Sequence, residues 1–165
     1  YMEGSFRPGH FQGVVTVVKR FFDIIKPTRA YFGEKDYQQL LIIKYMTRHY
    51  GLNTEIISHR VERGANGLAL SSRNELMPDS DKDQAKFIYS ILQWAQQHFR
   101  GHTPQALQLE VEKRFSDSPL ELEYALVCNP QTLEPVGEWD EKEGARLFIA
   151  AYMGKVRLID NVSLF

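Results

Sequence analysis

The sequence of 165 residues lacks several features that would assign it to a specialised class of protein. A single cysteine, Cys128, excludes an intramolecular disulfide framework and a cysteine-rich zinc site. Its net charge of -1 gives no basic surface of the size that general nucleic-acid binding requires. No uncharged apolar run approaches the roughly 20 residues of a membrane span, and no secretory signal is visible. We therefore expect a reduced, cytoplasmic protein with no nucleic-acid or membrane partner.

The first third of the chain has the alternating pattern of an α/β fold. Apolar side chains recur at helical spacing over residues 11–25, and Pro27 ends this predicted helix. The short apolar piece 30–32 predicts a brief buried strand, which a helix ending at Gly51 follows. Residues 54–58 predict a second strand. A strand, a helix and a strand in such close succession form a βαβ unit, which implies a parallel sheet.

The rest of the chain changes in character to α+β. Residues 62–78 are rich in Gly, Asn, Ser and Arg, which predicts an exposed loop. Two helices follow, and the second begins at Thr103-Pro104. Residues 120–124 alternate strictly, as in a half-buried strand, and two later strands flank a predicted hairpin at Met153-Gly154. The predicted fold class is thus α/β followed by a small α+β domain with helices and an antiparallel sheet.

Residues 32–39 place a glycine, a lysine and a helix start directly after the first strand. Ligands of open α/β sheets bind beyond the carboxyl ends of strands, near helix N-termini that favour anions. Gly33 removes a side chain there, and Lys35 adds a positive charge. The same residues also fit a plain strand–turn–helix, in which Asp36 and Gln39 cap the helix and Lys35 points into solvent. The spacing alone leaves both interpretations open.

Two other segments hold side chains suited to binding an anion or moving a proton. Ser71, Ser72 and Arg73 place two hydroxyls and a guanidinium in one loop, which suits phosphate oxygens but is also ordinary loop composition. His10 has the pKa range of an acid–base group near neutral pH, although a residue at this place more often caps a helix. We predict no metal site, because the other histidines lack ligand spacing and are expected on the surface: His49, His59, His98 and His102.

Three longer motifs resemble those of the pantoate–β-alanine ligase (pantothenate synthetase) family. In chain order they are Arg7-Pro-Gly-His-Phe-Gln-Gly-Val14, Phe32-Gly-Glu-Lys-Asp-Tyr-Gln-Gln-Leu40 and Gly67-Leu-Ala-Leu-Ser-Ser-Arg-Asn74. Arg157-Leu-Ile-Asp-Asn161 resembles the C-terminal signature of the family. The HxGH signature of the family's nucleotidyltransferase domain is missing. The resemblance therefore implies the C-terminal part of a Rossmann-like catalytic domain at 1–61 and a small lid domain at 62–165.

The resemblance implies an AMP-forming ligase that condenses (R)-pantoate with β-alanine to give pantothenate. ATP, supplied with Mg²⁺, would convert pantoate to pantoyl adenylate and pyrophosphate, and the amine of β-alanine would then displace AMP. No tightly bound cofactor is implied, and the full-length enzyme is expected to be a homodimer. We expect the 165 residues alone to be inactive. The alternatives are a nucleotide-binding module without catalysis and a lid or structural domain that serves only interaction.

The resemblance also implies roles for individual residues. Those implied to bind ATP are Gly33, Glu34, Lys35, Asp36, Glu62, Leu70, Ser71, Ser72 and Arg73. Those implied in catalysis are His10, Lys35, Ser71, Ser72 and Arg73. Lys35 would contact phosphate, and residues 70–73 would act as a mobile phosphate clamp. Gln39 would hydrogen-bond pantoate, which competes with its predicted capping role.

Two positions depart from the family pattern ahead of the clamp. Glu62 stands where the family has an apolar residue whose backbone contacts adenine, and a main-chain contact tolerates that exchange. Asn66 replaces an aspartate and so removes one negative charge near the clamp. Glu3 and Arg7, like His10, are implied to lie near the active site.

Overall fold

The computed structural model describes residues 2, 4 and 7–165, so Glu3 lies outside the described residues. The chain divides into two compact units, Tyr1–Val61 and Glu62–Phe165. Each unit has a hydrophobic cluster of its own. Within the described part of the chain, no helix is both long enough and apolar enough to cross a membrane.

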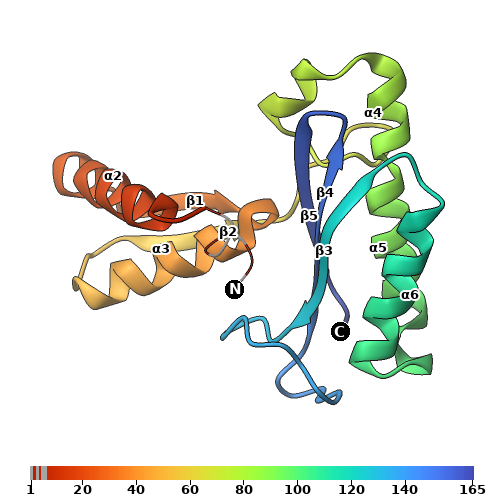
Figure 1. Ribbon diagram of the computed structural model, residues 1–165. Helices are drawn as coiled ribbons and strands as arrows, with labels where there is room; N and C mark the ends of the chain where they lie inside the picture. Colours follow the sequence, from red (N-terminus) through yellow and green to blue (C-terminus); the bar gives the residue numbers. More distant parts are fainter. Residues whose placement is uncertain (1, 3, 5–6) are drawn as a thin grey trace. The chain divides into compact units, whose positions relative to one another are not determined.

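The first unit is a βαβ unit preceded by a helix (Figure 1). β1 and β2 pair in parallel, with Gly33 opposite His59 at their carboxyl ends. The parallel α/β arrangement predicted from the sequence is therefore confirmed. The elements of this unit are α2 (His10–Ile25), β1 (Arg29–Gly33), the 3₁₀ turn η1 (Glu34–Asp36), α3 (Tyr37–His49) and β2 (Glu55–His59).

The core of the first unit lies between its two helices and one face of its sheet. Phe22 of α2 clusters with Ile43 and Met46 of α3, and Phe32 of β1 packs against them. The opposite face of β1 is open, since Tyr31 is 66% exposed. The prediction of a buried strand at 30–32 was therefore wrong, because the helices of this unit cover only one face of β1.

Helix α3 ends as predicted but does not begin as predicted. Gly51 follows its C-terminus with a φ of +58°, and the N–H groups of Gly51 and Leu52 donate to the carbonyls of Arg48 and Thr47. This pair of bonds is a Schellman motif, which satisfies the last carbonyls of the helix. At the other end, Asp36 makes no side-chain capping bond. The 3₁₀ turn η1 runs directly into the helix, so Asp36 lacks the extended backbone of a capping residue.

The second unit packs helices against a three-stranded antiparallel sheet of order β3-β4-β5, which confirms the predicted α+β arrangement (Figure 1). The Thr103 hydroxyl caps α6 by accepting a bond from the N–H of Ala106, as predicted. Gly154, with a φ of +57°, forms the predicted hairpin turn. The elements are η2 (Ser72–Leu76), α4 (Asp79–Ala85), α5 (Phe87–His98), η3 (Phe99–Gly101), α6 (Pro104–Ser116), β3 (Glu121–Cys128), β4 (Arg146–Met153) and β5 (Val156–Ser163).

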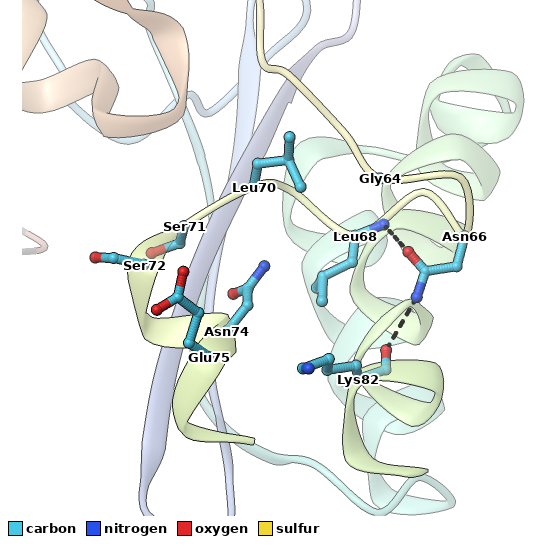
Figure 2. A pocket seen from close by; sticks show the side chains of 9 residues that line it. All are labelled: Gly64, Asn66, Leu68, Leu70, Ser71, Ser72, Asn74, Glu75 and Lys82. Atoms are coloured by element: carbon cyan, nitrogen blue, oxygen red, sulfur yellow. Dashed lines mark hydrogen bonds between the residues drawn. The ribbon is translucent and has the colours of Figure 1, made fainter. Parts of the chain in front are cut away.

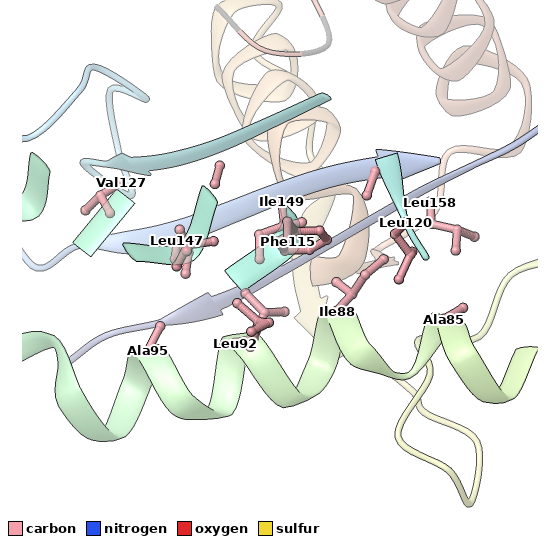
Figure 3. Packing of buried hydrophobic residues seen from close by; sticks show 14 of the residues in the cluster. Ala85, Ile88, Leu92, Ala95, Phe115, Leu120, Val127, Leu147, Ile149 and Leu158 are labelled. Atoms are coloured by element: carbon pink, nitrogen blue, oxygen red, sulfur yellow. The ribbon is translucent and has the colours of Figure 1, made fainter. Parts of the chain in front are cut away.

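One stripe of α5 forms much of the core of the second unit (Figure 3). Ile88, Leu92 and Ala95 are at most 2% exposed, and their spacing of four and three residues places them on one helical face. Leu147 and Ile149 of β4 belong to the same cluster. Burial of each of the large side chains stabilises the fold by roughly 1.5–3 kcal/mol. Leu68 and Met77 of the loop before α4 belong to the same cluster.

Strand β3 departs from the strict alternation that its sequence predicts. The pairing register with β4 shifts between Leu122 and Tyr124, so that Glu123 is an extra residue in the strand. Such a β-bulge re-aims a side chain. The Glu123 carboxylate accepts bonds from the Tyr152 hydroxyl, at 3.2 Å, and from the Arg157 guanidinium.

Candidate functional site

The first candidate segment lies at the carboxyl end of β1. Gly33 ends the strand, and Glu34, Lys35 and Asp36 form η1 directly before the N-terminus of α3. A Cβ placed on Gly33 would meet no described atom within 4 Å, so the backbone is open on that side. Gln39 lies in the first turn of α3 and is half-buried. The segment thus combines a strand end, a helix N-terminus and a cation, an arrangement suited to an anionic ligand.

His10 is the first residue of α2 and lies beside Arg7. Gly9, with a φ of +77°, occupies the capping position, and the helix has no side-chain cap. The interpretation of His10 as a helix cap is therefore wrong. An Nη1 atom of Arg7 lies 3.0 Å from His10 Nε2. Since an arginine can only donate, Nε2 is the acceptor in this contact.

The other histidines divide into three exposed residues and one half-buried residue. His49, His59 and His98 are exposed, as predicted. His102 is half-buried: its ring meets Trp94 edge-on at 5.9 Å, and its carbonyl accepts a bond from Trp139. The surface prediction was wrong for His102, because two distant tryptophans pack against it. Among the described residues, no three His, Cys, Asp or Glu side chains form a metal site.

The second candidate segment borders a pocket of about 630 Å³ in the second unit (Figure 2). Leu70, Ser71 and Ser72 line it, whereas the exposed Arg73 and Glu62 do not. The structure therefore brings three of the predicted clamp residues together at this pocket and leaves Glu62 and Arg73, the other ATP-binding candidates of the second unit, outside its lining. Its full lining is Gly64, Asn66, Leu68, Leu70, Ser71, Ser72, Asn74, Glu75 and Lys82.

The segment is folded more tightly than the predicted exposed loop. Leu68, Ala69 and Met77 are at most 7% exposed, so the loop prediction for 62–78 was wrong at these positions. The N–H of Leu70 donates to the carbonyl of Glu62 at 2.9 Å. A short antiparallel bridge between Arg63 and Ala69 closes the turn. Tertiary packing overrides the polar composition here, because the few apolar side chains of the loop reach the core of the unit.

Ser71 and Asn74 shape the part of the segment that carries the hydroxyls. Ser71 Oγ accepts a bond from the N–H of Arg73 at 3.3 Å and starts the 3₁₀ turn η2. Asn74 Nδ2 donates to the carbonyl of Ala69 at 3.0 Å. Asn74 Oδ1 is buried and accepts no hydrogen bond from the described residues. Because buried acceptors are normally satisfied, Asn74 presents an acceptor for a donor that a ligand or water brings.

Asn66 makes two hydrogen bonds, one of which an aspartate at this position could not make. Its Oδ1 accepts a bond from the N–H of Leu68 at 3.2 Å, and its Nδ2 donates to the carbonyl of Lys82 at 3.4 Å. A carboxylate has no hydrogen to donate to that carbonyl. Lys82 in turn donates to Asp79 at 2.9 Å, and this bond and the lysine charge hold the pKa of Asp79 below its ordinary value. Asn66 therefore ties the loop to α4.

The sequence indicates only some of the residues that line the pocket. Asn74 is the last residue of the motif at 67–74, although no role was predicted for it. Glu75 and Lys82 had no signal of their own, because their place in the pocket depends on how the loop meets α4 (Figure 2). Glu75 brings a carboxylate to the same pocket as the Lys82 ammonium.

Comparisons with known proteins point in one direction. The family model described as pantoate-beta-alanine ligase matches residues 1–163. The pantothenate synthetase of Christiangramia forsetii is 43% identical over 164 residues, which are 99% of this chain and 58% of that protein. A crystal structure of pantothenate synthetase from Thermus thermophilus has a TM-score of 0.91 at 38% identity, and the match covers 99% of this chain and 59% of that one.

A third relative was solved with ligands. The pantoate-beta-alanine ligase of Francisella tularensis, described as complexed with beta-gamma ATP and beta-alanine, has a TM-score of 0.75 at 35% identity. The match covers 99% of this chain and 54% of that one. The chain thus spans less than two thirds of the length of these relatives.

Proposed function

Because this chain belongs to the pantoate–β-alanine ligase family, we propose that the whole protein condenses (R)-pantoate with β-alanine to give pantothenate, using ATP. The observation that carries the proposal is the pocket lined by Leu70, Ser71 and Ser72 within a family motif. The relative described in complex with beta-gamma ATP and beta-alanine supports the choice of substrates. We assign residues 1–61 to the catalytic domain and 62–165 to the lid.

The first step joins pantoate to AMP. A carboxylate oxygen of pantoate attacks the α-phosphorus of ATP, and the bond from that phosphorus to the bridging oxygen breaks, which releases pyrophosphate. Negative charge grows on the phosphate oxygens, and Lys35 with the N-terminus of α3 stabilises it. Ser71, Ser72 and Arg73 supply further donors, each worth roughly 3 kcal/mol at the transition state if held in place.

The second step forms the amide bond. The amine of β-alanine attacks the carbonyl carbon of pantoyl adenylate, the bond to the AMP oxygen breaks, and the nitrogen loses a proton. Gln39 hydrogen-bonds pantoate, and Gly33, Glu34 and Asp36 hold the ribose and the adjoining turn. His10, which the family resemblance implies in catalysis, is the candidate for proton transfer.

Magnesium enters this reaction as part of the ATP substrate. The described residues include no group of three metal-ligating side chains. We assign the screening of the remaining phosphate charge to the ion that accompanies the nucleotide. We further propose that the full-length enzyme is a cytoplasmic homodimer, and sedimentation of the whole protein tests the dimer.

The experiment that tests the function follows the formation of AMP, pyrophosphate and pantothenate by the whole protein. We expect all three products only when ATP, pantoate and β-alanine are present together. Arg73→Ala should lower kcat/KM by about 100-fold, the loss expected for a preorganised charge. Arg48→Ala, which removes an exposed arginine from the end of α3, is the matched control and should have little effect. Nucleotide binding without turnover would instead identify a binding module.

A further inference from the structure

A partly buried arginine, Arg63, lies directly before the loop that leads to Ser71. The Arg63 side chain is 17% exposed, and its partner, Asp160 of β5, is 4% exposed. Nη1 of Arg63 lies 2.5 Å from Oδ2 of Asp160, and Nη2 lies 3.0 Å from Oδ1. This two-bond arrangement fixes the orientation of the guanidinium as well as its position. Asp160 also accepts a bond from the N–H of Asn161 at 2.8 Å.

The same guanidinium holds the turn that follows it. Nη1 of Arg63 donates to the carbonyl of Gly67 at 3.2 Å. The Cζ atom of Arg63 lies 3.8 Å from the centre of the Tyr89 ring of α5, which is a cation–π contact. One side chain therefore links the turn to β5 and to α5.

Gly67 fits this arrangement because it has no side chain. Its φ is +89°, and a Cβ there would lie 2.6 Å from Cδ1 of Tyr89. The turn can therefore approach the ring only with glycine at this position. Tyr89 meets the turn from one side while Arg63 stacks on the same ring.

The turn is connected through the main chain to Ser71 and Ser72, which carry the hydroxyls of the pocket. Arg63 is bridged to Ala69, and the next residue, Leu70, donates to the carbonyl of Glu62. Ser71 and Ser72 follow without a break. Their backbone therefore starts from a point that is set by the contacts of Arg63.

We propose that Arg63 is a positioning residue for the phosphate-binding segment, with Asp160 as its anchor in the sheet. The proposal rests on the proposed function of that segment, because the role assigned to Arg63 is to position Ser71 and Ser72 for binding ATP. A buried ion pair is a poor source of net stability compared with apolar side chains of equal volume. Its bidentate geometry is a good source of orientation.

Four variants of the whole protein test the proposal: Arg63→Gln, Arg63→Lys, Asp160→Asn and the double variant Arg63→Gln/Asp160→Asn. The matched control is Arg29→Gln, which removes an arginine from an ion pair whose two side chains are 65% and 60% exposed. Two kinds of measurement are made. Steady-state kinetics gives kcat and the KM of each substrate, and hydrogen exchange gives the amide exchange rates at Leu68 and Leu70 compared with those in α5.

We expect Arg63→Gln to raise the KM for ATP by about 10-fold or more, because a misplacement of ~1 Å is costly in an active site. The KM values for pantoate and β-alanine should stay within about twofold, which separates misplacement from general damage. Exchange at Leu70 should accelerate while exchange in α5 stays unchanged. Arg63→Lys should be intermediate, because it keeps the charge and loses the fork.

The double variant should be no worse than the worse single variant, since both remove the same contact. Arg29→Gln should change none of these quantities. If Asp160→Asn does not fold, Arg63→Lys and Arg63→Gln still decide the matter. An unchanged KM for ATP, with or without faster exchange at Leu70, overturns the positioning role and leaves the proposed function intact.

A loss in kcat alone, with faster exchange throughout α5, identifies a merely structural role and also overturns the proposal. Failure of the wild-type protein to form AMP at all overturns the proposed function, and the positioning proposal falls with it. These results are distinguishable, because exchange at Leu70 is measured without any substrate.

Discussion

The two candidate phosphate-binding segments are held in different ways. Residues 33–36 are fixed by the main chain, since they join the ladder of β1 directly to α3. Residues 70–73 are held by the main-chain bond from Leu70 to Glu62 and by two side chains that lie outside them. Arg63 contacts Asp160 of β5 and Tyr89 of α5, and Asn66 donates to the Lys82 carbonyl of α4. The first segment is as rigid as the elements on either side of it. The second depends on a few hydrogen bonds and on the buried apolar side chains of Leu68 and Met77 on either side of it.

This difference suits the roles proposed for the two segments. A segment built into a strand–helix junction moves only when the unit unfolds locally. A segment held largely by individual side-chain contacts can change its conformation, as these contacts break and form again, while α5 and the sheet keep theirs. A mobile phosphate clamp needs the second property, and a fixed phosphate site needs the first.

The largest expected effect compares the ion pairs of the two units. Asp160→Ala should lower the free energy of unfolding by about 3–5 kcal/mol, because it removes the buried member of the pair and leaves the partly buried Arg63 charge without its partner. Glu55→Ala breaks an exposed pair with Arg29 in the first unit and should cost at most about 1 kcal/mol. Urea denaturation of both variants checks this. Equal losses would remove the distinction between the two ways of holding a segment.

The next prediction separates the effect of the Lys35 charge from that of the main chain around it. Lys35→Ala should lower kcat/KM of the whole protein by ~100-fold, which is about 3 kcal/mol of transition-state stabilisation. The thermal unfolding midpoint should not move, since the main chain around residue 35 is held by β1 and α3. Lys155→Ala, at the exposed tip of the β4–β5 hairpin, is the control and should alter neither quantity. A large drop in the midpoint for Lys35→Ala would contradict the main-chain description.

A smaller effect distinguishes two glycines of the first unit. Gly51→Ala should destabilise the protein by about 1–2 kcal/mol, because its φ of +58° is strained for any residue with a Cβ. Gly33→Ala should stay within about 0.5 kcal/mol, since its φ is -71° and the space around it is open. Calorimetry of the two variants measures the difference. A costly Gly33→Ala would show that the strand end is more confined than its contacts indicate.

The last prediction concerns pH and belongs to the second unit. Burial raises the pKa of Cys128 to about 11. Between an ordinary thiol pKa of about 8.5 and this value, the unfolded chain has lost a proton that the folded chain keeps, so stability falls as pH rises. Denaturation at about pH 8 and about pH 10.5, on either side of the ordinary thiol pKa, should show this fall in the wild type. Cys128→Ala should lack that share of the fall, and an identical pH dependence in both proteins would contradict the assignment.

Much of the fold follows from local signals in the sequence. The helical spacing before Pro27, the glycine at position 51 and the Thr103-Pro104 start all act within one turn of the residues that they control. Gly154 likewise needs only its own backbone to make a hairpin turn. Local chemistry decided these features, and the structure agrees with them.

The features that the sequence did not predict depend on distant partners. Arg63 and Asp160 are 97 residues apart, and no periodicity relates them. The bulge at Glu123 needs the register of β4, which residues 120–124 do not encode. The residues proposed to bind ATP and pantoate were identified by resemblance, and their roles stay predictions. A local sequence pattern indicates the type of side chain at a position, but it does not indicate a partner that lies far away in the chain.

The distance along the chain between Arg63 and Asp160 has a consequence for biosynthesis. A ribosome that adds about 5–20 residues per second needs about 5–20 s to pass from one to the other. During that interval the segment with Ser71 and Ser72 has been synthesised, but the strand that anchors it has not. If Arg63 positions the segment as proposed, the segment is held in place only after β5 has been made, and the proposed capacity to bind ATP arises late in synthesis.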